Sequence, residues 1–127
     1  MGNKTFLDFS GKTIVVSGAS SGIGKATAIL LGDYGATLVL MGRNQANLEE
    51  TASRISGQSH IVRLDLMEHS KIVPAIQDLS KRVGRIYGLC HCAGIVETRP
   101  LASYKIDGLN AMLGINLVAG IELSRAI

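Results

Sequence analysis

The stretch VVSGASSGIG, residues 15–24, joins an apolar run to a cluster of small residues that includes three glycines. The preceding run KTIVVS, residues 12–17, is rich in β-branched residues, which is typical of a buried parallel strand. From Gly22 onward, apolar residues follow the spacing of one helical face: Ile23, Ala26, Leu30 and Tyr34. Gly35 is placed to end that helix. The stretch therefore predicts a strand, a tight turn and a helix in direct succession.

The same alternation of short extended runs and longer helical runs continues along the chain. Three further strands are predicted at residues 36–41, 60–64 and 85–93, with helices between them. The helix before the fourth strand should start only a residue or two before Pro74, because proline fits the first helical turn. A last helix is expected from about Asp107, with these residues facing inward: Leu109, Leu113, Leu117 and Gly120 or Ile121.

Strands that alternate with helices of this length imply right-handed crossovers and a parallel sheet covered by helices on both faces. We therefore predict a single α/β domain over residues 1–127, a doubly wound, Rossmann-like sheet in three layers with strand order 3-2-1-4. In such sheets ligands bind beyond the carboxyl ends of the strands, where the strand order reverses. Here the loops after the first and fourth strands should meet at that point.

Composition excludes several classes of protein. The 127 residues are 46% hydrophobic and 18% charged, and the net charge of +3 comes from scattered basic residues, which does not indicate nucleic-acid binding. No leader peptide is recognised, and no apolar run reaches the roughly 18 residues of a membrane span, so we expect no membrane partner. Cys90 and Cys92 match neither a zinc nor a redox motif, so reduced thiols, no metal and a cytoplasmic location are expected.

The glycine spacing Gly18-x-x-x-Gly22-x-Gly24 predicts a phosphate-binding loop. Gly18 can adopt the positive φ of a tight turn, Gly22 lets a diphosphate approach the backbone, and Gly24 lets the helix pack close to the sheet. Free amides at the helix start then face the anion. A tight turn without a ligand is the alternative, but the position between strand and helix favours dinucleotide binding.

The segment MGRN, residues 41–44, follows the second strand, where NAD-binding folds place a carboxylate for the ribose 2′-hydroxyl. This chain has no carboxylate there, and Arg43 can instead pair with a 2′-phosphate. NADP(H) is therefore favoured over NAD(H). A solvated surface arginine in a protein that uses NAD(H) is the alternative.

Five motifs together resemble the short-chain dehydrogenase/reductase family, in the same order and with similar spacing. They are SGASSGIG, GRN after the second strand, LDL at residues 64–66, CAG at 92–94 and INLVAG at 115–120. The resemblance implies that Arg43 takes the 2′-phosphate and that Asp65 and the Leu66 backbone hold the adenine. It also implies residues that line the diphosphate and the adenosine ribose: Ser20, Ser21 and Ile23.

The resemblance implies two further roles near the nicotinamide. Ala93 and Gly94 would lie beside the nicotinamide ribose, and Asn116 would order an active-site lysine through water. Without the resemblance, Asn116 is a buried polar residue that caps a neighbouring backbone group, and Asp65 is a helix N-cap. In HCAG, His91 and Cys92 depart from the usual N-N-A-G. His91 is interpreted as a hydrogen-bonded core histidine, because no second metal ligand is suitably spaced.

The proton donor that the family uses has no counterpart in these residues. The family combines a tyrosine, a lysine four residues later and a serine. Tyr34, Tyr87 and Tyr104 are followed at that spacing by Leu38, His91 and Gly108. We expect the chain to be the N-terminal, cofactor-binding half of a reductase, incomplete before the later strands, which binds the cofactor without reducing a substrate.

The complete protein is expected to transfer hydride between NADP(H) and a carbonyl or secondary alcohol, with a ketone or ketoacyl thioester as substrate. Two alternatives stay open: a dinucleotide-binding module without chemistry, serving as a sensor or scaffold, and a family member that uses NAD. The fourth strand is expected to be an apolar sheet edge, and such edges recruit other chains. Self-association through residues 86–92 or through the last helix is therefore predicted.

Overall fold

The computed structural model of the chain describes residues 7–127. Residues 1–6, on which the prediction of no leader peptide partly depends, lie outside the described residues. Four parallel strands form one sheet in the order β3-β2-β1-β4. Their bounds lie within two residues of the predicted ones: β1 Thr13–Ser17, β2 Thr37–Gly42, β3 Ser59–Arg63 and β4 Ile86–His91. The order and direction of the strands confirm the predicted doubly wound, Rossmann-like fold.

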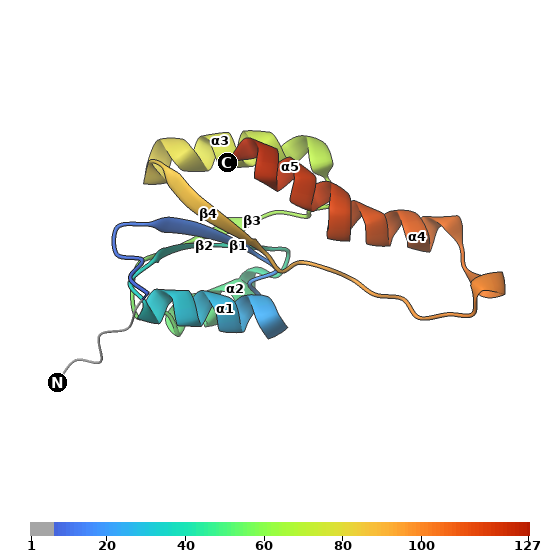
Figure 1. The fold of residues 1–127 in the computed structure, drawn as a ribbon, viewed down its shortest axis with the longest axis horizontal. Helices are drawn as coiled ribbons and strands as arrows, with labels where there is room; N and C mark the ends of the chain where they lie inside the picture. Colours follow the sequence, from blue (N-terminus) through green and yellow to red (C-terminus); the bar gives the residue numbers. More distant parts are fainter. Residues whose placement is uncertain (1–6) are drawn as a thin grey trace.

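Helices cover both faces of this sheet (Figure 1). α1 (Gly22–Asp33) and α2 (Gln45–Ser53) lie on one face, and α3 (His69–Val83) and α5 (Ala119–Ala126) lie on the other. Every residue of β1 is buried, and alternate side chains enter different cores. Ile14 and Val16 belong to the core under α1 and α2, whereas Val15 belongs to the core under α3 and α5.

α3 begins earlier than expected. It starts at His69, so Pro74 lies inside the helix and not in its first turn. The prediction about Pro74 is therefore wrong. Pro74 removes only one backbone hydrogen bond. Three fully buried side chains along one face of the helix hold it to the sheet: Ile72, Ile76 and Leu79. The apolar face of α3 outweighs the cost of the proline.

The last helix presents a different face to the core from the predicted one. α4 (Ile106–Leu113), a π-helical segment η2 (Gly114–Val118) and α5 form one continuous helix from Ile106 to Ala126. The side chains that are buried lie four residues apart: Ile115, Ala119 and Leu123. Of the predicted inward residues, Leu109, Leu113, Leu117 and Ile121 are all exposed, by 41%, 45%, 54% and 54% respectively. Gly120 is the one member of the predicted inward set that does approach the sheet, because a Cβ there would lie 2.9 Å from His91 Cδ2.

The physical reason is that only the second half of this helix packs against the helix layer on the sheet, whereas the first half meets the preceding loop, where the Glu97 N–H lies 3.3 Å from Met112 Sδ. α5 packs on α3, whereas α4 projects beyond the end of the sheet (Figure 1). The stripe that looks most apolar in the sequence therefore faces away from the described domain. The stripe with the smaller residues Gly114, Ala119 and Gly120 is the one that comes close to α3 and β4.

The continuous helix also differs from the expectation about membrane spans. Its 21 residues are long and apolar enough to cross a membrane, by length and composition alone. A helix that packs inside a folded domain can meet the same criteria. Here Ala119 and Leu123 are fully buried in the core beneath α3.

Candidate functional site

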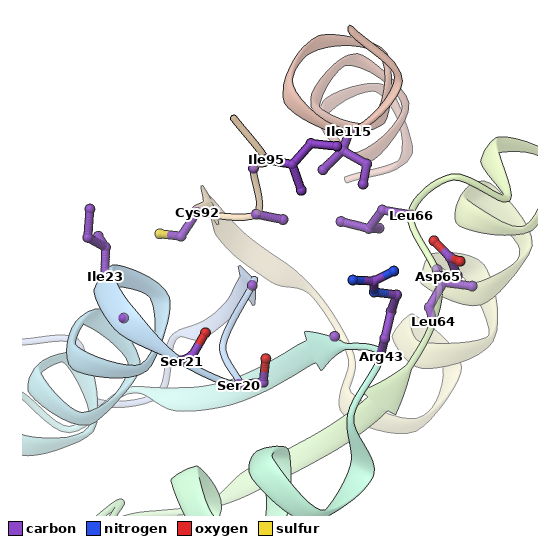
Figure 2. Close-up of a pocket in the computed structure, with 15 residues that line it drawn as sticks. Ser20, Ser21, Ile23, Arg43, Leu64, Asp65, Leu66, Cys92, Ile95 and Ile115 are labelled. Carbon is purple, nitrogen blue, oxygen red and sulfur yellow. The ribbon is translucent and has the colours of Figure 1, made fainter. Parts of the chain in front are cut away.

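An open cleft of about 350 Å³ lies at the carboxyl ends of the strands (Figure 2). Five segments line it: Gly18 and Ser20–Ile23, Gly42 and Arg43, Leu64–Leu66, Cys92–Ile95, and Ile115. The structure thus brings together all the predicted cofactor-binding residues except Gly24, which lies behind the loop. The predicted position, where the loops after β1 and β4 meet, is the place where the cleft is found.

The loop after β1 needs glycine for reasons of space as well as conformation. Gly18 has a φ of +68°, and a Cβ there would lie 2.7 Å from the Ala93 nitrogen in the loop after β4. A Cβ on Gly24 would lie 2.2 Å from the Gly18 carbonyl oxygen. The two glycines therefore allow the first turn of α1, the β1 loop and the β4 loop to pack directly against one another.

Gly22 differs because its side-chain position is open. It has a φ of +53°, and a Cβ there would meet nothing within 4 Å. Ser21 caps α1 without a side-chain hydrogen bond, and the first turn holds no acidic residue. The first N–H groups of the helix thus lack intrahelical partners and lie at the positive end of the helix dipole. This cradle fits a dinucleotide diphosphate, which needs close backbone approach and free amides.

Arg43 supplies the cation of the cleft. It follows β2, its side chain is exposed, and it points into the space between Leu66 and Ser20 (Figure 2). Its carbonyl oxygen accepts a hydrogen bond from Arg63 Nε at 3.1 Å. Within residues 7–127, no carboxylate forms an ion pair with Arg43. Its guanidinium is therefore available to an anion in the cleft.

Asp65 does not act as the N-cap of α3. Its Oδ1 accepts a hydrogen bond from the Met67 N–H at 2.9 Å, and the cap position is Glu68. The N-cap interpretation is therefore wrong. The turn that Asp65 stabilises through Met67 ends before α3 begins at His69. Asp65 stands half-buried at the edge of the cleft between the buried Leu64 and Leu66.

His91 joins three segments through hydrogen bonds. Its Nε2 lies 3.1 Å from the Ile115 carbonyl oxygen, and its Nδ1 lies 2.7 Å from Ser17 Oγ. A carbonyl can only accept, so Nε2 carries the proton and Nδ1 accepts from the Ser17 hydroxyl. Ser17 Oγ in turn accepts from the Ala93 N–H at 3.2 Å. This chain of bonds fixes the loop after β4, and it confirms that both ring nitrogens of His91 are hydrogen-bonded, although His91 is half-buried at the end of β4 and not part of the core.

Sequence reasoning did not identify Ser17 or the link to Ile115. Ser17 is the last residue of β1 and is fully buried, and its partners lie 74 and 76 positions along the chain. No local pattern reveals contacts at that separation. The only available signal was a polar residue at the end of an otherwise apolar strand, next to the glycine loop.

Asn116 holds the same loop from the other side. Its Oδ1 accepts from the Ile95 N–H at 2.8 Å, and its Nδ2 donates to the Ile95 carbonyl at 2.9 Å. The side-chain amide of Asn116 thus pairs with both backbone groups of Ile95, as a residue of a neighbouring strand would do. The interpretation as a residue that caps a backbone group describes this contact, although Asn116 is exposed and not buried.

The two cysteines are free thiols on one face of β4 and its extension, packed against the core under α1. Burial raises the pKa of the Cys90 thiol, and the neighbouring Cys92 raises it further. Cys92 also lines the cleft, on the side nearest Ile23 (Figure 2). Among residues 7–127, no group of three or more potential metal ligands is clustered.

Comparison with known proteins agrees with this geometry. The sequence profile of the short chain dehydrogenase family matches residues 12–127. An uncharacterised oxidoreductase of Listeria monocytogenes is 34% identical over 114 residues, which cover 87% of this chain and 46% of that protein. An uncharacterised oxidoreductase of Staphylococcus epidermidis is 30% identical over 115 residues, which cover 91% of this chain and 50% of that protein.

Two solved structures share the fold at similar identity. A metagenomic short-chain oxidoreductase in complex with NADP is 32% identical with a TM-score of 0.89, over 94% of this chain and 56% of that one. The citronellol catabolism dehydrogenase of Pseudomonas aeruginosa is 34% identical with a TM-score of 0.83, over 93% and 49%. The chain spans about half the length of the curated relatives it matches. From its sequence, its fold and its glycine loop, the chain belongs to the short-chain dehydrogenase family.

Proposed function

We propose that these residues bind NADP(H) for an oxidoreductase that transfers hydride between the nicotinamide and a carbonyl or secondary alcohol. The observation that carries the proposal is the open cradle at Gly22 with, in the same cleft, the Arg43 guanidinium, which forms no ion pair with any residue from 7 to 127. Membership of the short-chain dehydrogenase family and the similarity to a relative solved with NADP support it. When bound, the cofactor supplies the hydride.

In this proposal, different residues of the cleft bind different parts of the cofactor. The free amides at the start of α1 hold the diphosphate, and Ser20, Ser21 and Ile23 line the diphosphate and the adenosine ribose. Arg43 binds the 2′-phosphate. Asp65 and the Leu66 backbone hold the adenine. Ala93 and Gly94 lie beside the nicotinamide ribose, in the loop that His91 and Asn116 fix from both sides.

A comparison of NADPH with NADH tests the choice of cofactor. Both are titrated by calorimetry into the wild type and Arg43→Ala. Loss of the phosphate partner should weaken NADPH binding by about 1.5 to 3 kcal/mol and leave NADH almost unchanged, because a charge-assisted hydrogen bond is lost only with NADPH. Equal affinities for the two cofactors before and after the substitution would favour an NAD-using protein.

The acid that protonates the substrate in this family has no counterpart around the cleft in the described residues. Among residues 7–127, no tyrosine lines the cleft, and the Tyr104 hydroxyl donates to the Glu97 carbonyl. We propose that these 127 residues bind the cofactor without transferring hydride, and that a ketone or ketoacyl thioester reacts only in the complete enzyme. A dinucleotide-binding module without chemistry is the second candidate, and the same observation favours it. Incubation with NADPH and a panel of ketones and ketoacyl thioesters should leave the NADPH absorbance unchanged despite saturated binding.

We also propose that a second copy of the protein covers the outer face of the last helix. Exposed apolar side chains follow one another along it: Ile106, Leu109, Leu113, Leu117 and Ile121. Together they form an apolar stripe of the kind that marks protein interfaces. Sedimentation velocity should show association that Leu113→Glu abolishes, whereas a monomer at high concentration would contradict the proposal.

A further inference from the structure

A second arginine stands beside Arg43 at the rim of the cleft. Arg63 is the last residue of β3, and in the sheet register it lies opposite Gly42, the residue before Arg43. Its Nε donates to the Arg43 carbonyl oxygen at 3.1 Å. This bond fixes the orientation of the Arg63 guanidinium, because Nε is committed to the backbone while both Nη groups stay free for another acceptor.

The surroundings leave this guanidinium without a counter-ion. A hollow of about 470 Å³ adjoins the cleft and is lined by Arg43, Arg63, Leu64, Asp65, Glu68 and Lys71. Glu68 forms an ion pair with Lys71, and Asp65 accepts a hydrogen bond from Met67. In the described part of the chain, Arg63 itself forms no ion pair. Three cations and two carboxylates thus leave the hollow with an excess positive charge.

A doubly charged phosphate matches two adjacent guanidiniums better than one. Each guanidinium offers a planar set of donors that can bind two phosphate oxygens. A single exposed arginine binds weakly because water competes and its side chain must be ordered. Arg63 is already ordered by its bond to the Arg43 backbone, so less entropy is lost when an anion binds.

We propose that Arg63 is a second ligand of the 2′-phosphate and determines, with Arg43, the preference for the phosphorylated cofactor. The inference rests on the proposed NADP(H) function and extends it to a residue outside the recognised motifs.

Arg63→Gln separates this role from a purely structural one. Glutamine Nε2 can occupy the position of the arginine Nε and keep the bond to the Arg43 carbonyl, whereas the charge and both Nη groups are lost. A residue that only braces the backbone would tolerate the change. A phosphate ligand would not. Arg85→Gln is the matched control, because Arg85 is also exposed and precedes β4 outside the residues that line the cleft and the hollow.

The probes are 2′,5′-ADP and 5′-AMP, titrated by calorimetry into the 127-residue wild type and the variants. The wild type should prefer 2′,5′-ADP. Arg63→Gln should weaken 2′,5′-ADP about tenfold and 5′-AMP less than about twofold, as expected for loss of a charge-assisted contact to the 2′-phosphate alone. Arg85→Gln should bind both probes as the wild type does.

Each unexpected titration result would contradict a different part of the proposal. If Arg43→Ala weakens 2′,5′-ADP and Arg63→Gln does not, the role of Arg63 is overturned and the NADP(H) proposal stands. If the wild type binds both probes equally, the NADP(H) preference fails and the role of Arg63 fails with it. If Arg63→Gln weakens both probes equally, Arg63 acts on the shape of the cleft, and its role as a phosphate ligand is overturned.

Discussion

On the α1 side of the cleft the backbone itself makes the site, whereas on the β4 side side chains from distant segments hold a loop in place. Gly18, Gly22 and Gly24 form the first side because the absence of a Cβ lets backbone segments, or a ligand, come close. His91 and Asn116 create the second by forming hydrogen bonds to backbone groups 24 and 21 residues away. The two sides meet where Gly18 contacts Ala93.

This difference predicts opposite responses to mutation. The α1 side should fail when atoms are added, because the space between its backbone segments is already filled. The β4 side should fail when atoms are removed, because buried polar groups then lose their partners. Each substitution below tests one side of that contrast.

The largest effect is expected for Gly24→Ala. Its Cβ would lie 2.2 Å from the Gly18 carbonyl oxygen, in a contact between two backbone segments that cannot rotate away. We expect the free energy of unfolding to fall by about 3 kcal/mol, at the upper end for overpacking, with loss of dinucleotide binding. Urea unfolding followed by circular dichroism measures it.

Gly22→Ala gives the matched comparison on the same loop. The φ of +53° should cost about 1 kcal/mol, but the added Cβ meets open space, so the fold should persist while the filled cradle no longer accepts a diphosphate. Gly11→Ala, with a φ of +74° and open space outside the residues that line the cleft, controls for backbone strain alone. Full cofactor affinity in Gly22→Ala would contradict the role given to the cradle.

The second largest effect should come from His91→Phe. The phenyl ring removes the acceptor for the Ser17 hydroxyl proton, while Ser17 Oγ keeps its bond from the Ala93 N–H, and it removes the His91 donor to the Ile115 carbonyl. We expect a loss of about 2 kcal/mol in urea unfolding, the usual cost of unsatisfied buried polar groups. A double-mutant cycle with Ser17→Ala should show that the two losses do not add, because both substitutions break the same bond. Simple additivity would mean that no hydrogen-bonded link exists.

These two sides also differ in how well the sequence predicts them. The glycine spacing and the β-branched run before it are local, so β1, the loop and the bounds of α1 are found nearly where predicted. The apolar face read from the helical period is not the buried one: Ile23 and Leu30 are exposed, and the side that packs on the sheet consists of the small residues Gly24, Ala28 and Gly32. The position of the cleft and the strand order follow from general rules of parallel sheets. A backbone site with a local signature can therefore be predicted from one sequence.

The β4 side and the last helix depend on contacts that no local pattern encodes. Ile106–Ala126 has two apolar stripes, and its period alone cannot show which one meets α3. The correct stripe contains Ala119 and stands next to Gly114 and Gly120, so small residues marked the close contact better than large apolar ones did. Ser17 gave no comparable signal, because its partners lie more than 70 residues away.

A smaller effect is expected at Asn116. Asn116→Ala removes two hydrogen bonds to Ile95, but both groups lie near solvent, and water can replace the lost partners. The loss should be about 1 kcal/mol. Asn116→Asp keeps the acceptor for the Ile95 N–H and should recover part of it. Hydrogen exchange at the Ile95 amide measures the local opening directly, and an unchanged rate in Asn116→Ala would contradict the clamp.

The smallest effect is expected from the ion pair that joins α1 to α2. Lys25 of α1 donates to Glu50 of α2, and this hydrogen bond, opposed in part by desolvation, holds the pKa of Glu50 below its ordinary value of 4.5. A lowered pKa in the folded state means stability that is present above the unfolded pKa and lost as the pH falls through the folded one. The wild type should therefore lose slightly more stability than Glu50→Gln on acidification, and the two should converge at low pH.

Because Glu50 is exposed, solvent screens this pair, and thermal unfolding at neutral pH should differ little between wild type and Glu50→Gln. Glu49→Gln is the control, since Glu49 is also exposed and accepts a hydrogen bond from Gln45 of its own helix. If Glu50→Gln proved as damaging as His91→Phe, a side-chain contact would be holding the α1 side together. The contrast between a side made by backbone packing and a side made by side-chain hydrogen bonds would then be wrong.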